Sequence, residues 1–151
     1  METTDVDRLF VDTNILIYAT NEASPWHEVA NTALQTARQR GVDLILSPQI
    51  LREYLAAATR PAKTGTLSLP KILENFRTFQ TDFTVVEETK SGLAFLAEFL
   101  RTIPLGGKQI HDANIVATML TYNIPSLLTH NTDDFKRFAG YITVVPLMAS
   151  P

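Results

Sequence analysis

The chain has 151 residues, 45% hydrophobic and 19% charged, which predicts one globular domain over residues 1–151 and excludes a disordered chain. It has no cysteine, an acidic N-terminus and no run of roughly 20 apolar residues, so we expect a cytoplasmic protein without disulfides, signal peptide or membrane contact. The formal net charge of −3 argues against a broad basic surface for nucleic acid, although carboxylates that hold cations lower the formal charge in the same way.

Short apolar runs alternate with helical patterns along the chain. A strand at 8–12 precedes a helix at 14–21, and a second helix starts at the Ser24-Pro25 signal and ends at Gly41. A strand at 43–46 leads through Ser47-Pro48 into a helix reaching residue 60. Helices at 69–79, 91–102 and 110–122, with Asn123 as the stop of the last, alternate with strands at 83–86, 126–129 and 142–145. This α/β pattern predicts a three-layer α/β/α sandwich around a mostly parallel sheet of about five strands.

An aspartate ends the first predicted strand. In an open parallel sheet, ligands bind beyond the carboxyl ends of the strands, and Asp12 lies at such an end. Asp12 also precedes a predicted helix, so a plain N-cap role is the alternative. These two interpretations stay open at this point.

A glutamate interrupts the apolar stripe of the helix at 48–60. Glu53 follows Ile50 by three residues and precedes Ala57 by four, so it lies on the inward face. A carboxylate there must be paired, lie at the rim or hold a cation. The alternative to a cation site is a salt bridge with Arg52 or Arg60.

An aspartate opens the helix at 110–122 in a similar way. Asp112 precedes Ile115 by three residues and Met119 by seven, which aligns it with the inward face. The helix dipole favours an acid in the first turn, but it does not explain the inward direction.

A further acidic segment follows the predicted strand at 126–129. Asn131, Asp133 and Asp134 lie at another carboxyl end, where turn and capping roles are the alternative. Several carboxylates gathered at one edge of a sheet repel one another unless a cation is present. Oxygen ligands of this kind suit Mg²⁺ or Mn²⁺ rather than zinc.

These residues resemble the PIN domain, and more narrowly the toxin ribonuclease of bacterial VapBC-type toxin–antitoxin modules. The resemblance covers residues 9–146, and four motifs carry it in the family's order: FVDTN at 10–14, RE at 52–53, HDANIVA at 111–117 and LTHNTDDF at 128–135. It implies an endoribonuclease that hydrolyses single-stranded RNA with Mg²⁺ or Mn²⁺ and a metal-activated water, and an antitoxin and a homodimer as partners.

The resemblance also implies roles for individual residues. Metal binding maps to Asp12, Glu53 and Asp112, and Asp134 joins them as a catalytic residue. The fourth family position varies between Asp and Asn and is Asn131 here, so Asp134, or Asp133, supplies the fourth charge. The supporting side chains implied around these acids are Thr13, Asn14, Thr129 and Asn131.

Basic and aromatic residues near these motifs are candidates for holding RNA. The basic candidates are Arg52, Arg60, Lys63 and Lys108, and Tyr54 is a candidate for stacking on a base. Ordinary surface charge and a tyrosine at the core edge are the alternatives. The helices at 69–79 and 91–100 carry more Phe and Leu than one face needs, which suggests either a subunit interface or a larger core.

Other protein classes fit less well. A phosphatase of the haloacid dehalogenase type would carry a second aspartate at position 14, which is Asn14 here, and a phosphoacceptor receiver domain would need an acidic pair and a late lysine that the chain lacks. A PIN-like scaffold that binds RNA or protein without cleavage is disfavoured by the intact acids. A PIN nuclease of RNA processing without an antitoxin stays open.

Overall fold

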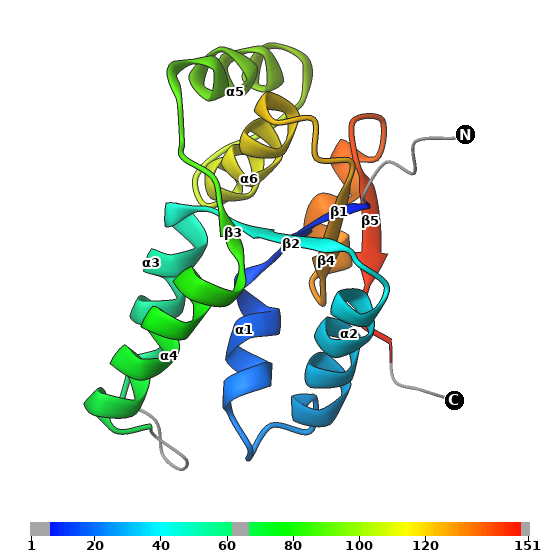
Figure 1. The fold of residues 1–151 in the computed structure, drawn as a ribbon. Helices are drawn as coiled ribbons and strands as arrows, with labels where there is room; N and C mark the ends of the chain where they lie inside the picture. The colour runs from blue at the N-terminus through cyan, green and yellow to red at the C-terminus, as the bar shows by residue number, and fades with distance from the viewer. Residues whose placement is uncertain (1–6, 62–66, 149–151) are drawn as a thin grey trace.

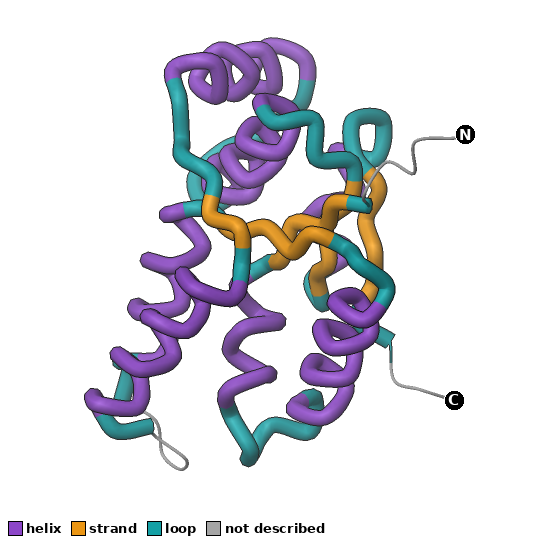
Figure 2. Tube along the Cα trace, viewed as in Figure 1, coloured by secondary structure: helices purple, strands orange, loops and turns teal. Residues whose placement is uncertain are grey.

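The computed structural model describes residues 7–61 and 67–148, and their strands form one sheet in the order β3-β2-β1-β4-β5. All four strand pairings are parallel. Figure 2 shows the strands enclosed between helices, and the expected three-layer sandwich with about five strands is confirmed. The strands are β1 (Arg8–Val11), β2 (Asp43–Leu46), β3 (Thr84–Val85), β4 (Ser126–Thr129) and β5 (Thr143–Pro146).

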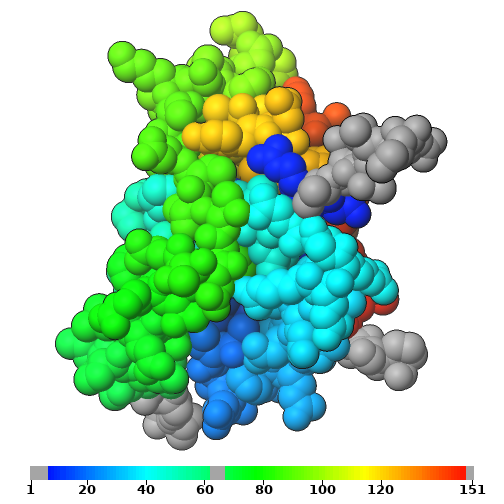
Figure 3. Space-filling view, viewed as in Figure 1, coloured from blue at the N-terminus to red at the C-terminus, as the bar shows by residue number. Residues whose placement is uncertain are grey.

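Helices lie on both sides of this sheet. In Figure 1, α1 and α2 lie below the strands, whereas α5 and α6 pack against each other above them. Helices α3 and α4 form a further pair, and Figure 3 shows α4 and α5 at the periphery of the molecule. The helices are α1 (Thr13–Thr20), α2 (His27–Gln39), α3 (Pro48–Ala58), α4 (Leu69–Asp82), α5 (Lys90–Thr102), α6 (Gln109–Thr121) and α7 (Thr132–Phe135), the last followed by the 3-10 turn η1 (Lys136–Phe138).

The central strands form the middle of the core. Consecutive apolar residues on a strand are buried together because helices cover both faces of a parallel sheet. No helix of the described residues combines the length and apolar character needed to cross a membrane. The apolar strand residues with no exposed surface are Phe10, Val11, Ile45, Leu46 and Leu127.

The strand order places a switch point at the centre of the sheet. The chain fills the β1-β2-β3 half first and then returns to the other side of β1 to add β4 and β5. Val11 on β1 is in register with Leu128 on β4, so the next residues, Asp12 and Thr129, lie side by side at the carboxyl ends. This is where open α/β sheets bind ligands.

One predicted helix start is wrong. Helix α2 begins at His27 rather than at Ser24-Pro25, because Ser24 closes a turn instead. Its hydroxyl accepts a hydrogen bond from the Trp26 N–H at 3.1 Å, and its carbonyl accepts one from the His27 N–H at 3.2 Å. Gly41, with φ of 77°, follows the helix as predicted.

Other predicted boundaries are confirmed or shifted by a few residues. Helix α3 begins at Pro48 as predicted but ends at Ala58, and α4 continues three residues further, to Asp82. Ser47 is the N-cap of α3, yet its buried hydroxyl has no hydrogen-bond partner among the described residues. Asn123 adopts a φ of 55° just after α6, which confirms it as the stop of that helix.

Candidate active site

Asp12 lies at the carboxyl end of β1 with only 7% of its surface exposed. Its Oδ1 accepts a hydrogen bond from the Thr13 N–H at 2.8 Å. Its Oδ2 accepts from the Thr129 hydroxyl at 2.7 Å and from the Asn14 amide at 3.3 Å. Asp12 is therefore both the N-cap of α1 and a strand-end carboxylate, so the two sequence interpretations are compatible.

The surroundings of Asp12 disfavour its ionised form. Burial raises the pKa of Asp12, and the hydrogen bonds from Thr129 and Thr13 lower it only in part. The negative charges of Glu53 and Asp134 raise this pKa further. The carboxylate is thus oriented by donors but lacks a compensating positive charge.

Glu53 is partly buried on α3, and its carboxylate faces the start of α1, the helix that Asp12 caps. Its Oε2 accepts a hydrogen bond from the Thr13 hydroxyl at 2.6 Å, and its Oε1 accepts one from the Gln49 amide at 2.9 Å. The alternative salt bridge with Arg52 or Arg60 is wrong, because the ion pairs found in the described parts of the chain do not include Glu53.

Asp112 lies in the first turn of α6 and is partly buried. Burial is the largest cause that raises its pKa to about 6, and the charges of Asp134, Asp12 and Glu53 add to it. The positive charge of Arg137 lowers this pKa without cancelling the rise. The neighbouring charges come from separate segments, so acids at the end of β1 and on α3, α6 and α7 lie close enough to influence one another's ionisation.

The segment after β4 places the three candidates for the fourth position in different surroundings, and both Asp133 and Asp134 are exposed. Asp133 is exposed and pairs with Lys136 at 2.6 Å, so its charge is compensated elsewhere. Asp134 raises the pKa of two of the carboxylates described above, which places its charge at the site. Asn131 is the exposed N-cap of α7, and its backbone N–H donates to the Thr129 hydroxyl at 3.0 Å.

The donor set suits a hard divalent cation. It offers only oxygen, and among residues 7–61 and 67–148 these acids form no ion pair. In the same residues, no three acids, histidines or cysteines converge closely enough to hold a metal directly. Magnesium commonly binds through one or two carboxylates and keeps several waters, so this spacing still fits it. The four carboxylates are those of Asp12, Glu53, Asp112 and Asp134.

The family of the chain follows from comparing its sequence with the profiles of known families. The sequence profile described as the PIN domain matches residues 9–141. The chain belongs to the PIN domain family. The resemblance noted in the sequence is therefore confirmed over most of its length.

Individual relatives agree with this assignment. Ribonuclease VapC48 of Mycobacterium tuberculosis is 29% identical over 134 residues, which covers 85% of this chain and 90% of that protein. The structure of VapBC2 from Rickettsia felis bound to a promoter DNA fragment has a TM-score of 0.70 at 16% identity, covering 93% of this chain and 99% of that one. VapC20 of M. tuberculosis, a sarcin-ricin loop cleaving toxin, has a TM-score of 0.69 at 19% identity, covering 91% and 99%. At such identities the structures establish the PIN fold.

The sequence analysis missed one side chain that organises this PIN site. The Gln49 amide donates both to Glu53 and to the carbonyl of His111 at 2.8 Å, and its carbonyl accepts from the Asn114 amide at 2.7 Å. Gln49 thus ties α3 to the start of α6. Its spacing, four residues before Glu53 on one helix face, was the available signal.

The predicted RNA-binding residues lie in different surroundings. Arg52 is exposed and lines a pocket of about 220 Å³ next to Glu53, together with Gln49 and His111. Arg60 and Lys108 are exposed at the end of α3 and the start of α6. Lys63 lies outside the described residues.

The prediction that Tyr54 stacks on a base is wrong. Its side chain is 1% exposed and packs edge-on against Phe79, with ring centroids 4.9 Å apart. Its hydroxyl accepts a hydrogen bond from the buried Asn75 amide at 3.0 Å. Tyr54 is a core residue that joins α3 to α4.

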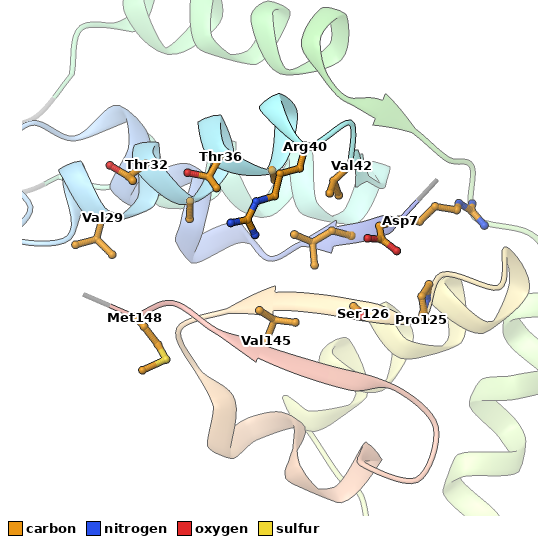
Figure 4. A pocket seen from close by; sticks show the side chains of 14 residues that line it. Asp7, Val29, Thr32, Thr36, Arg40, Val42, Pro125, Ser126, Val145 and Met148 are labelled. Atoms are coloured by element: carbon orange, nitrogen blue, oxygen red, sulfur yellow. The ribbon is translucent and has the colours of Figure 1, made fainter. Parts of the chain in front are cut away.

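A larger cavity lies away from the carboxylates. It has a volume of about 590 Å³ and runs along α2 to the starts of β1 and β4 and the end of β5 (Figure 4). Its lining includes Thr32 and Thr36 of α2 and the C-cap residue Arg40, but none of the four acids. This cavity is therefore separate from the candidate site formed by the carboxylates.

Proposed function

We propose that this chain, one PIN domain over residues 1–151, is an endoribonuclease that hydrolyses single-stranded RNA with Mg²⁺ or Mn²⁺. The observation that carries the proposal is that Asp12, Glu53, Asp112 and Asp134 lie near the switch point of the sheet, where burial and the neighbouring acids raise the pKa of Asp12 and Asp112. Family membership and the activity named for its M. tuberculosis relative support the same reaction.

The residues would divide the work of hydrolysis. Asp12, Glu53 and Asp112 would hold the cation, which supplies charge stabilisation at the phosphate and makes the attacking water more acidic. Glu53 or Asp134 would orient that water and take up its proton. The water oxygen then joins phosphorus as the bond to O3′ breaks, leaving a 5′ phosphate and a 3′ hydroxyl.

Several hydrogen bonds would keep the acids in position before RNA arrives. Thr129 and Asn14 direct Oδ2 of Asp12, and Thr13 bridges the two acids through its N–H to Asp12 and its hydroxyl to Glu53. Outer partners of this kind fix the orientation of metal-binding carboxylates. Asn131 contributes through its backbone, by holding the Thr129 hydroxyl.

The partners are part of the same proposal. We assign the chain to the toxin side of a type II toxin–antitoxin module, acting in the cytoplasm and inhibited by an antitoxin protein, because VapBC assemblies share its fold. A homodimer fits the apolar side chains that α4 and α5 leave at the periphery (Figure 3). The most exposed of them are Leu69, Leu73, Leu93 and Leu100.

Cleavage of a labelled single-stranded RNA by the purified chain tests the activity. We expect cleavage with Mg²⁺ or Mn²⁺, none after chelation by EDTA, and recovery when the metal is added back. The products should carry 5′ phosphates, and the same sequence in a duplex should resist. Cleavage that persists in EDTA, or products with a 2′,3′-cyclic phosphate, would exclude the proposed chemistry.

A further inference from the structure

Three aromatic rings from separate segments gather beside the carboxylates. Tyr18 comes from α1, Trp26 from the turn before α2, and His130 from the residue after β4. The ring centroids of Trp26 and His130 are 4.3 Å apart, and those of Tyr18 and His130 are 5.5 Å apart in an edge-on arrangement. Tyr18 and Trp26 complete the group at 6.5 Å.

This aromatic cluster, Tyr18, Trp26 and His130, adjoins the acid site directly. The backbone N–H of His130 donates to the side-chain Oδ1 of Asn14 at 3.2 Å, and the Asn14 side-chain amide donates to Oδ2 of Asp12 at 3.3 Å. Tyr18 lies four residues after Asn14 on α1, and hence on the same face of that helix. Two hydrogen bonds therefore connect the backbone of His130 to the buried carboxylate of Asp12.

The backbone around the cluster is fixed by several contacts. His27 Nδ1 lies 2.9 Å from the carbonyl of Tyr18, and the Asn31 amide donates to the carbonyl of Ala19 at 3.0 Å. These contacts attach the first turn of α2 to the last turn of α1. The bond from the Trp26 N–H to Ser24 fixes the intervening turn. A surface held in this way loses little conformational freedom when it binds a ligand.

Tyr18, Trp26 and His130 are each partly buried rather than enclosed in the core. The buried Tyr54 shows the contrast, because its ring is enclosed and its hydroxyl satisfied within the core. Aromatic faces next to a phosphate-cleaving site can receive unpaired bases, since every base presents a π-face.

We propose that Tyr18, Trp26 and His130 form a stacking platform for an unpaired nucleobase flanking the phosphate that meets the carboxylates. The inference rests on the proposed ribonuclease function and adds where the substrate base is held. A base inside a duplex is already stacked and cannot reach the platform. The platform thus gives a physical reason for single-strand selectivity with little dependence on base identity.

Trp26 provides a direct probe, because it is the only tryptophan of the chain. Its fluorescence would be titrated with a single-stranded RNA oligonucleotide in the Asp12→Asn protein, which still has the platform but should not cleave. A sugar–phosphate chain of the same length without bases carries the same charge and serves as the comparison. We expect saturable quenching by the RNA and none by the abasic chain at the same concentrations.

Variants separate stacking from a purely structural role. Trp26→Leu should raise the dissociation constant for labelled RNA, and the KM for cleavage, by about 5- to 100-fold, as expected when one base–aromatic stack is lost. Trp26→Phe, which retains a ring, should recover most of the affinity. Tyr141→Ala is the matched control. Tyr141 is 44% exposed, its ring packs on Phe99 of α5, and it lies just before β5, away from the carboxyl ends of the strands.

Any of the following results would overturn the platform without touching the proposed reaction. One is equal quenching by RNA and by the abasic chain, which would indicate charge alone. Another is a Trp26→Leu enzyme with unchanged KM and RNA affinity. Further ones are a Trp26→Phe protein as impaired as Trp26→Leu, or a Trp26→Leu defect matched by its loss of thermal stability. Failure of the wild-type chain to cleave any RNA would instead count against the proposed function, while the fluorescence titration still decides the platform.

Discussion

Asp12→Asn is expected to lower kcat/KM for RNA cleavage by about 10³-fold, because a carboxylate that stabilises transition-state charge through a cation contributes several kcal/mol. The variant keeps the size of the side chain. Its remaining oxygen still accepts a hydrogen bond from the Thr13 N–H, so the N-cap of α1 is preserved. The Thr129 hydroxyl and the Asn14 amide, which donate to Oδ2, lose this acceptor, a local cost that leaves the buried strands unchanged. The fold should therefore remain.

Initial rates on a labelled single-stranded RNA, paired with a circular dichroism melt, measure both parts of this expectation. Asp133→Asn is the control with the same change of charge, since Asp133 is exposed and pairs with Lys136. Its activity should stay within about two-fold of the wild type, as is usual for surface charges. An Asp12→Asn protein that is folded and retains a tenth or more of the activity would contradict the assigned role.

Asp112→Asn is expected to stabilise the metal-free protein at pH 8. The pKa of Asp112 rises from an ordinary 3.8 to about 6, which corresponds to at most ~3 kcal/mol. Partial exposure to solvent reduces this to about 1–2 kcal/mol. Because the folded state binds the proton more tightly than the unfolded state, this contribution is present below pH 4 and is lost as the pH rises through about 6. Asparagine cannot ionise and avoids that loss.

Guanidinium unfolding in EDTA, measured from pH 4 to pH 8 for the variant and the wild type, tests this difference. The gain in the free energy of unfolding should be near zero at pH 4 and reach its full value by pH 7. Asp133→Asn should show no gain in this window, because its carboxylate is exposed and paired. A variant that is less stable than the wild type at pH 8, or a gain that does not change with pH, would show that burial and the neighbouring acids do not raise the pKa of Asp112.

The sequence contained enough to predict the fold and the directions of the main acids. The buried strands read as continuous apolar runs, and the inward positions of Glu53 and Asp112 followed from helix periodicity. Asp12 was placed by its strand end, and the parallel register with β4 brings it beside Thr129.

The remaining features depend on contacts that periodicity does not encode. The distinction between Asp134 and Asp133 depends on Lys136, which forms an ion pair with Asp133. Tyr54 is buried because α4 folds over α3, a tertiary contact that the residue's own helix does not reveal. Trp26 lies on no regular element, so its contact with His130, 104 positions along, required the assembled sheet.

The central claim is that Asp12 and Asp112 help to hold the cation required for RNA cleavage. Calorimetric titration of Mn²⁺ into the wild-type chain and into the double variant Asp12→Asn/Asp112→Asn tests it most directly. We expect saturable binding by the wild type at pH 7.5 and a loss of affinity of more than about 100-fold in the double variant, beyond what removal of an outer partner produces. Equal binding by the two proteins, or no binding by a folded wild type, would contradict the account and favour a PIN scaffold that does not cut.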